Sequence, residues 1–131
     1  MTQAIWIDTA EFRDYGGWTL DTQFTHHIGA PYLMAIGLGA PVADARHELE
    51  VRRPGRYRLW VLARNWLPEH TPGTFTVGMR CFRTAVELAP GTVFGAGTTD
   101  DWTWEDAGAV DLPQGRLLLR LHDRTGDYGR C

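Results

Sequence analysis

The sequence predicts an all-β fold, an antiparallel β-sandwich. Apolar and polar side chains alternate with a period of two along most of the chain, which is the pattern of strands with one buried face. Turn residues, above all Gly and Pro, recur at short intervals between these stretches. With 131 residues and no linker or internal repeat, the chain has the size of one domain with a substantial core. We therefore expect residues 1–131 to form a single β-sandwich module.

The candidate strands follow one another along the chain. Three short ones are expected at residues 4–9, 18–22 and 32–35, and residues 45–51, 57–63, 75–81 and 117–121 show the clearest alternation. Pro54-Gly55 and Pro113-Gln114-Gly115 are each expected to turn a hairpin. The predicted apolar faces are Ala45, His47, Leu49 and Val51; Tyr57, Leu59, Val61 and Ala63; Phe75, Val77, Met79 and Cys81; and Leu117, Leu119 and Leu121.

One segment also suits a helix. Pro41 fits a first helical position, and the Ala, Arg and Glu residues that follow it up to residue 50 favour helices. The strict alternation that continues to Val51 favours a strand instead, and the strand is the structure we expect.

Composition excludes several classes of function. The formal net charge of −3 gives no electrostatic attraction for nucleic acid or an anionic membrane, and no apolar run is long enough to span a bilayer. The chain contains no Ser, which excludes a serine nucleophile, and Gly37-Leu38-Gly39 lacks the third glycine of a dinucleotide site. The five histidines show no metal-ligand spacing. We expect a protein that is not an enzyme and that holds no cofactor or metal.

Six runs of the sequence carry a family resemblance. They are Asp8-Thr9-Ala10-Glu11-Phe12, Gly16-Gly17-Trp18, Asp21-Thr22-Gln23-Phe24, Gly29-Ala30-Pro31-Tyr32-Leu33, Gly55-Arg56-Tyr57-Arg58-Leu59-Trp60-Val61 and Leu121-His122-Asp123-Arg124-Thr125-Gly126. In this order and spacing they resemble the galactose-binding-like β-sandwich domains grouped with carbohydrate-binding modules of the family 6 and 35 type. Such domains are appended to bacterial FAD-dependent oxidoreductases and to polysaccharide-degrading proteins.

The resemblance implies a jelly-roll sandwich and a non-catalytic carbohydrate-binding module within a larger or multi-component protein. Any FAD would then belong to a linked catalytic domain. Modules of this type often hold a structural calcium with two acidic residues on the first strand. Asp8 matches the first acid, but Ala10 stands at the second position, which weakens a calcium assignment.

Carbohydrate recognition needs aromatic rings for the apolar face of a sugar, together with carboxylates and Arg for its hydroxyls. Two long loops flanked by aromatic residues, 65–73 and 90–104, supply such side chains. Trp18 and Trp60 are expected to be core packing residues instead. The candidate ligand-binding residues are Trp66, His70, Trp102, Trp104, Asp21, Asp123 and Arg124.

Two other interpretations remain open. The acidic, Trp-containing stretch at residues 100–106 suits an interdomain contact surface, because aromatic anchors ringed by polar residues are typical of protein interfaces. The chain would then be a structural module that docks on a catalytic partner and binds no sugar. A small lyase or hydrolase using the carboxylates of that stretch is the less favoured alternative.

Overall fold

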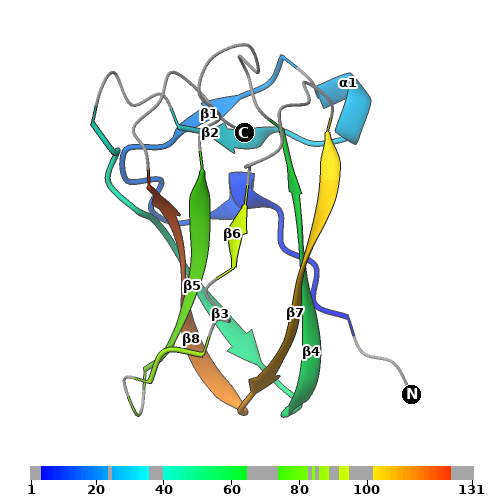
Figure 1. Ribbon diagram of the computed structural model, residues 1–131, viewed down its shortest axis with the longest axis vertical. Helices are drawn as coiled ribbons and strands as arrows, with labels where there is room; N and C mark the ends of the chain where they lie inside the picture. The colour runs from blue at the N-terminus through cyan, green and yellow to red at the C-terminus, as the bar shows by residue number, and fades with distance from the viewer. Residues whose placement is uncertain are drawn as a thin grey trace.

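The computed structural model describes residues 4–23, 25–35, 40–64, 74–82, 84, 86–88, 92–94 and 102–124. It confirms an all-β antiparallel sandwich (Figure 1), while the jelly-roll assignment stays a prediction. The strands are β1 (Thr19–Asp21), β2 (Tyr32–Met34), β3 (Ala45–Val51), β4 (Gly55–Ala63), β5 (Phe75–Cys81), β6 (Val93–Phe94), β7 (Thr103–Leu112) and β8 (Gly115–Asp123).

Two sheets face one another, and a short third one lies across their end (Figure 1). The larger sheet has the strand order β3-β8-β5-β6, and the opposite sheet consists of β4 and β7. The third sheet is the antiparallel pair of β1 and β2. Because every named pair is antiparallel, each sheet can bury one face and leave the other in solvent.

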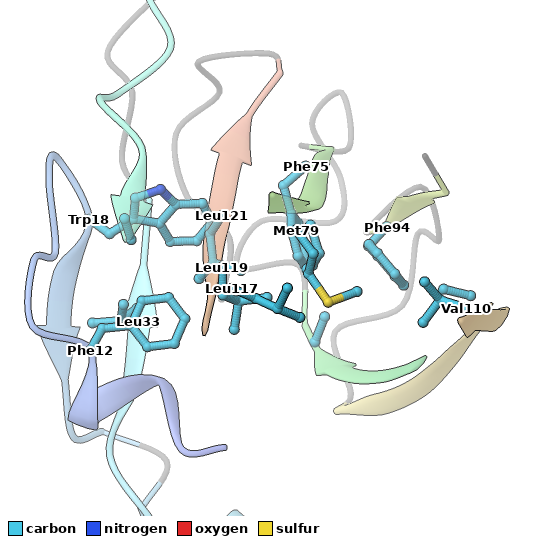
Figure 2. Packing of buried hydrophobic residues seen from close by; sticks show 14 of the residues in the cluster. Phe12, Trp18, Leu33, Phe75, Met79, Phe94, Val110, Leu117, Leu119 and Leu121 are labelled. Atoms are coloured by element: carbon cyan, nitrogen blue, oxygen red, sulfur yellow. The ribbon is translucent and has the colours of Figure 1, made fainter. Parts of the chain in front are cut away.

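The core lies on the inner faces of these sheets, as the alternation predicts. Both predicted apolar rows of the large sheet's middle strands are buried, and Figure 2 shows Met79 and Phe94 pointing toward Val110 of β7. The predicted strand at residues 45–51 is confirmed as β3, and the competing helix is wrong. The buried residues of these two rows are Phe75, Val77, Met79, Cys81, Leu117, Leu119 and Leu121.

Both predicted hairpins are wrong, because each turn crosses from one sheet to the other. β3 pairs with β8, whereas β4, which follows it across Pro54, pairs with β7. The turn at Pro113-Gln114 likewise leads from β7 to β8, in opposite sheets. Alternation shows which side chains of a strand are buried, but it gives the same pattern whether the next strand pairs beside it or faces it across the core.

Some elements differ from the predictions. Residues 4–8 form no strand, and they lead into a 3₁₀ helix, η1 (Thr9–Glu11). A single helical turn, α1 (Thr25–Ile28), also was not predicted. Strand β7 was missed because a β-bulge at Gly108, whose φ is 85°, interrupts the period of two.

The segment before β1 lies close against the start of β3. Asp14 forms a β-bridge with Arg46, and the amide of Gly17 donates to the carbonyl of Ala43 at 2.9 Å. Gly16 has a φ of 57°, and a Cβ built there would stand 2.0 Å from the backbone oxygen of Asp44. Only glycine tolerates both the left-handed conformation and this approach.

Gly16→Ala should therefore destabilise the fold, by about 2–4 kcal/mol from backbone strain and overpacking together. Urea unfolding followed by Trp fluorescence measures the change. Gly55→Ala is the matched control, because a Cβ at Gly55 meets nothing within 4 Å. Equal stability of both variants would contradict the packing described for residues 14–18.

Candidate functional site: the tryptophan-lined groove along β4

A groove of about 1210 Å³ runs along β4 on the open side of the sandwich. It reaches between the sheets to the inner faces of β5 and β8, and residues 4–9 also line it. Its lining is mainly apolar, and it includes all five tryptophans of the described part of the chain. These are Trp6, Trp18, Trp60, Trp102 and Trp104.

The outer face of the β4–β7 sheet carries tryptophans that solvent reaches. Trp104 lies opposite Leu62 in the strand register, and Trp60 lies opposite Asp106. Residues directly opposite in an antiparallel pair share one face, so Trp60 and Trp104 are diagonal neighbours on that face. Trp60 is 51% exposed and Trp104 is 49% exposed. The ring of Trp6 packs edge-on against Trp104, with 5.9 Å between the centroids. We call Trp6, Trp60 and Trp104 the outer tryptophan face.

An ion pair stands beside Trp60 on the same face. The Nε of Arg58 donates to both carboxylate oxygens of Asp106, at 3.0 and 2.9 Å. The guanidinium carbon of Arg58 lies 6.0 Å from the centre of the Trp60 ring, within cation–π range. Asp106 also accepts a hydrogen bond of 2.8 Å from the amide of Gly108, the bulge residue. The amide of the bulge residue therefore holds the Asp106 carboxylate in position, and the carboxylate holds the Arg58 guanidinium in position.

These contacts keep both groups charged. The hydrogen bonds from Arg58 and from the Gly108 amide hold the pKa of Asp106 below its ordinary value. The hydrogen bond to Asp106 in turn raises the pKa of Arg58. At neutral pH the face thus presents a cation and an anion next to aromatic rings.

Trp102 and Asp21 each contact Tyr32, which lines the groove. The ring of Trp102 packs against Tyr32, with 4.9 Å between the centroids, and both belong to a small apolar cluster with Met34. The hydroxyl of Tyr32 donates to the carboxylate of Asp21. Of the residues predicted from sequence, the structure brings Trp102 and Trp104 to the groove and places Asp21 behind Tyr32.

Asp123 and Arg124 lie outside the groove. Asp123 is fully buried at the end of β8, and its carboxylate accepts a hydrogen bond of 3.0 Å from the amide of Val42. The guanidinium of Arg124 donates to the hydroxyl of Thr74 at 3.2 Å. Trp66 and His70, the remaining predicted residues, are outside the described part of the chain.

Three residues of the site were missed or misassigned from sequence. Trp60 was expected in the core and is exposed, whereas the same expectation for Trp18, which is 4% exposed, is confirmed. The alternation already indicated that Trp60 is exposed, because it lies two residues from Arg58 and therefore on the same polar face of β4. The alternation did not indicate a role for Trp6 or Arg58 in the site. Their contacts with Trp104 and Asp106 depend on which distant segments of the chain lie side by side.

A scan against protein-family models found no match for this chain, and a search of the curated proteins found none either. The fold and the groove therefore define the class, a β-sandwich with an aromatic-lined groove.

The described residues narrow the chemistry further. Among them, no three His, Cys, Asp or Glu side chains lie close enough together to hold a metal ion. The helices within the same residues are too short to cross a membrane.

Arg58→Gln should raise the pKa of Asp106 toward the ordinary aspartate value, because the largest cause of its lowering is the hydrogen bond from Arg58. In the unmodified protein the ion pair exists at neutral pH and is lost as the pH falls through the lowered pKa. A carboxyl-carbon NMR titration of both proteins measures this. The same midpoint in both would contradict the pairing.

Asp123→Ala should cost about 1–3 kcal/mol of stability, because it leaves a partly buried backbone amide without its acceptor. Asp111→Ala, at an exposed position of β7, should change stability little. Chemical unfolding of the two variants gives the comparison. If Asp111→Ala lost as much stability as Asp123→Ala, the burial of Asp123 would not be the cause of its destabilisation.

Proposed function

We propose that this chain is a non-catalytic carbohydrate-binding-type module of a larger or multi-component protein, and that it binds sugar on the outer tryptophan face. The observation that carries the proposal is the exposure of Trp60 and Trp104 on one sheet face, beside a fixed arginine–carboxylate pair.

The chemistry of that face suits a sugar ring. The apolar side of a pyranose stacks on an aromatic ring, and its hydroxyls need donors and acceptors at the edge of the stack. Arg58 supplies N–H donors and Asp106 supplies acceptor oxygens, and their mutual hydrogen bonds hold both in place before a ligand arrives. Pre-ordered side chains lose little conformational entropy on binding, which favours affinity.

The sequence resemblance to carbohydrate-binding modules of the family 6 and 35 type supports the same proposal. The proposed site differs in location from the site that the sequence predicted. The sequence pointed to loop residues, whereas the outer tryptophan face lies on a sheet. The face is shallow, so we expect micromolar or weaker affinity, with little surface buried and many hydroxyls to desolvate.

The alternative is an interaction module whose exposed tryptophans anchor a protein partner. Aromatic side chains beside Arg are also typical of the centres of protein interfaces. The two functions differ in what quenches or shifts the fluorescence of these tryptophans, a soluble glycan or a protein.

Titration of the protein with neutral and acidic polysaccharides, followed by intrinsic Trp fluorescence and calorimetry, tests the proposal. Trp60→Ala and Trp104→Ala should each weaken binding about tenfold or more, the equivalent of about 1.4 kcal/mol for a lost aromatic stack. Phe82→Ala is the matched control, because Phe82 is 50% exposed and lies outside the groove.

Two results would count against a sugar-binding face. A flat response of the folded protein to the whole panel favours the interaction module. Equal weakening by Phe82→Ala and Trp60→Ala would show non-specific adsorption rather than a site.

A further inference from the structure

The exposed charges of the β4–β7 sheet balance one another beside the outer tryptophan face. Of the residues on these strands that alternate onto this face, Arg56 and Arg58 are the cations. Asp106 and Asp111 are the anions. Arg56 lies directly opposite Asp111 in the register, and the ion pair described above neutralises Arg58. Opposite charges that face one another across strands stabilise a sheet. The two strands therefore offer a ligand no excess charge of either sign.

Asp106 occupies the part of Arg58 that an acidic sugar would need. A guanidinium recognises a carboxylate best with two parallel N–H groups. The Nε and Nη2 groups of Arg58 both donate to Asp106 already. A sugar carboxylate placed here would lose that bidentate contact and would meet a like charge. A neutral hydroxyl can instead accept from the remaining N–H groups of Arg58 and donate to Asp106.

A sugar chain that stacks on this face has to pass Asp106. Trp60 lies opposite Asp106 in the register, and Trp104 is the diagonal neighbour of Trp60, about 7–8 Å away. A pyranose ring is no larger than an indole, so contact with both tryptophans takes more than a single sugar unit. From the level of Trp104 to that of Arg58 the face extends about 14 Å along β4. An extended chain stacked on both tryptophans therefore brings a neighbouring sugar unit to the ion pair.

We infer that Asp106 is the specificity-determining residue of this face, and that it selects an extended stretch of uncharged glycan over an acidic one. The inference rests on the proposed sugar-binding function and names its ligand class. The neutral chain stacks on Trp104 and Trp60 and exchanges hydroxyl hydrogen bonds with Arg58 and Asp106. Asp106 repels an acidic chain of the same shape, and Arg58 supplies no compensating bidentate contact. Selectivity of this kind comes from an unfavourable contact with the wrong ligand.

Matched glycans test the charge selection. Linear tetrasaccharides of glucose, mannose and galactose are each compared with the same tetrasaccharide after oxidation of its primary hydroxyls to carboxylates. Calorimetry at neutral pH should show that a neutral tetrasaccharide binds the full chain about fivefold or more tighter than its oxidised form. The corresponding single sugar should bind about tenfold or more weakly than the neutral tetrasaccharide, because one ring cannot contact both tryptophans.

Asp106→Asn separates charge from shape. Asn keeps a side-chain oxygen for the amide of Gly108 and removes the negative charge, so Arg58 becomes available to a sugar carboxylate. The oxidised tetrasaccharide should bind Asp106→Asn about fivefold or more tighter than it binds the unmodified protein. Glu48→Gln is the matched control, because it makes the same change in net charge at an exposed position of β3, in the opposite sheet. It should leave both affinities unchanged, and urea unfolding checks that each variant is folded.

The outcomes distinguish failure of the inference from failure of the proposed function. If no glycan of either kind binds, the sugar-binding function fails and the inference fails with it. If glycans bind and Trp60→Ala weakens them, but the oxidised form binds as tightly as the neutral one, the function stands and the role of Asp106 is overturned. Unchanged binding of the oxidised form to Asp106→Asn would overturn that role as well. A single sugar that binds as tightly as the tetrasaccharide would overturn the extended chain.

Discussion

The large sheet depends on β8, which has the most extensive pairing of its strands. It runs antiparallel to β3 and to β5 along almost its whole length, and Leu117, Leu119 and Leu121 project from it into the core. Full burial of each leucine contributes about 1.5–3 kcal/mol. Among the described residues, the opposite sheet has no such strand, because β4 and β7 pair with each other and with no further described strand. The groove lies beside this smaller sheet, since the described part of one wall has four strands and that of the other has two.

A single irregularity in the narrow wall arranges the candidate sugar site. The bulge at Gly108 adds one residue to β7, so that Asp106 falls opposite Trp60 while Val110 and Leu112 keep their place in the core. The amide of Gly108 then binds Asp106, which in turn holds Arg58. Backbone geometry thus sets the positions of charges that lie far apart in the sequence, and both charges persist at neutral pH because each stabilises the other.

The sequence predicted burial far better than it predicted neighbours. Alternation identified the inner rows of β5 and β8, since the period of a strand depends on local geometry alone. It could not show that the turns at Pro54 and Pro113 cross between sheets, nor that Trp6 would reach Trp104, because these depend on long-range pairing. The groove was likewise beyond prediction. It lies along β4, whose pairing depends on residues far away in the sequence, and no local pattern records that.

The two crossing turns lie at the same end of the sandwich (Figure 1), so the two shortest connections between the β4–β7 pair and the large sheet are at that end. A nine-residue strand such as β4 is about 30 Å long. By simple leverage, each degree of rotation about the turns displaces its opposite tip by about 0.5 Å at that strand length. At that tip the contact between Trp102 and Tyr32 joins the start of β7 to the β1–β2 sheet, and Asp21 accepts a hydrogen bond from the hydroxyl of Tyr32. This small aromatic contact therefore ties the far end of the two-stranded wall to the sheet that lies across the end of the sandwich.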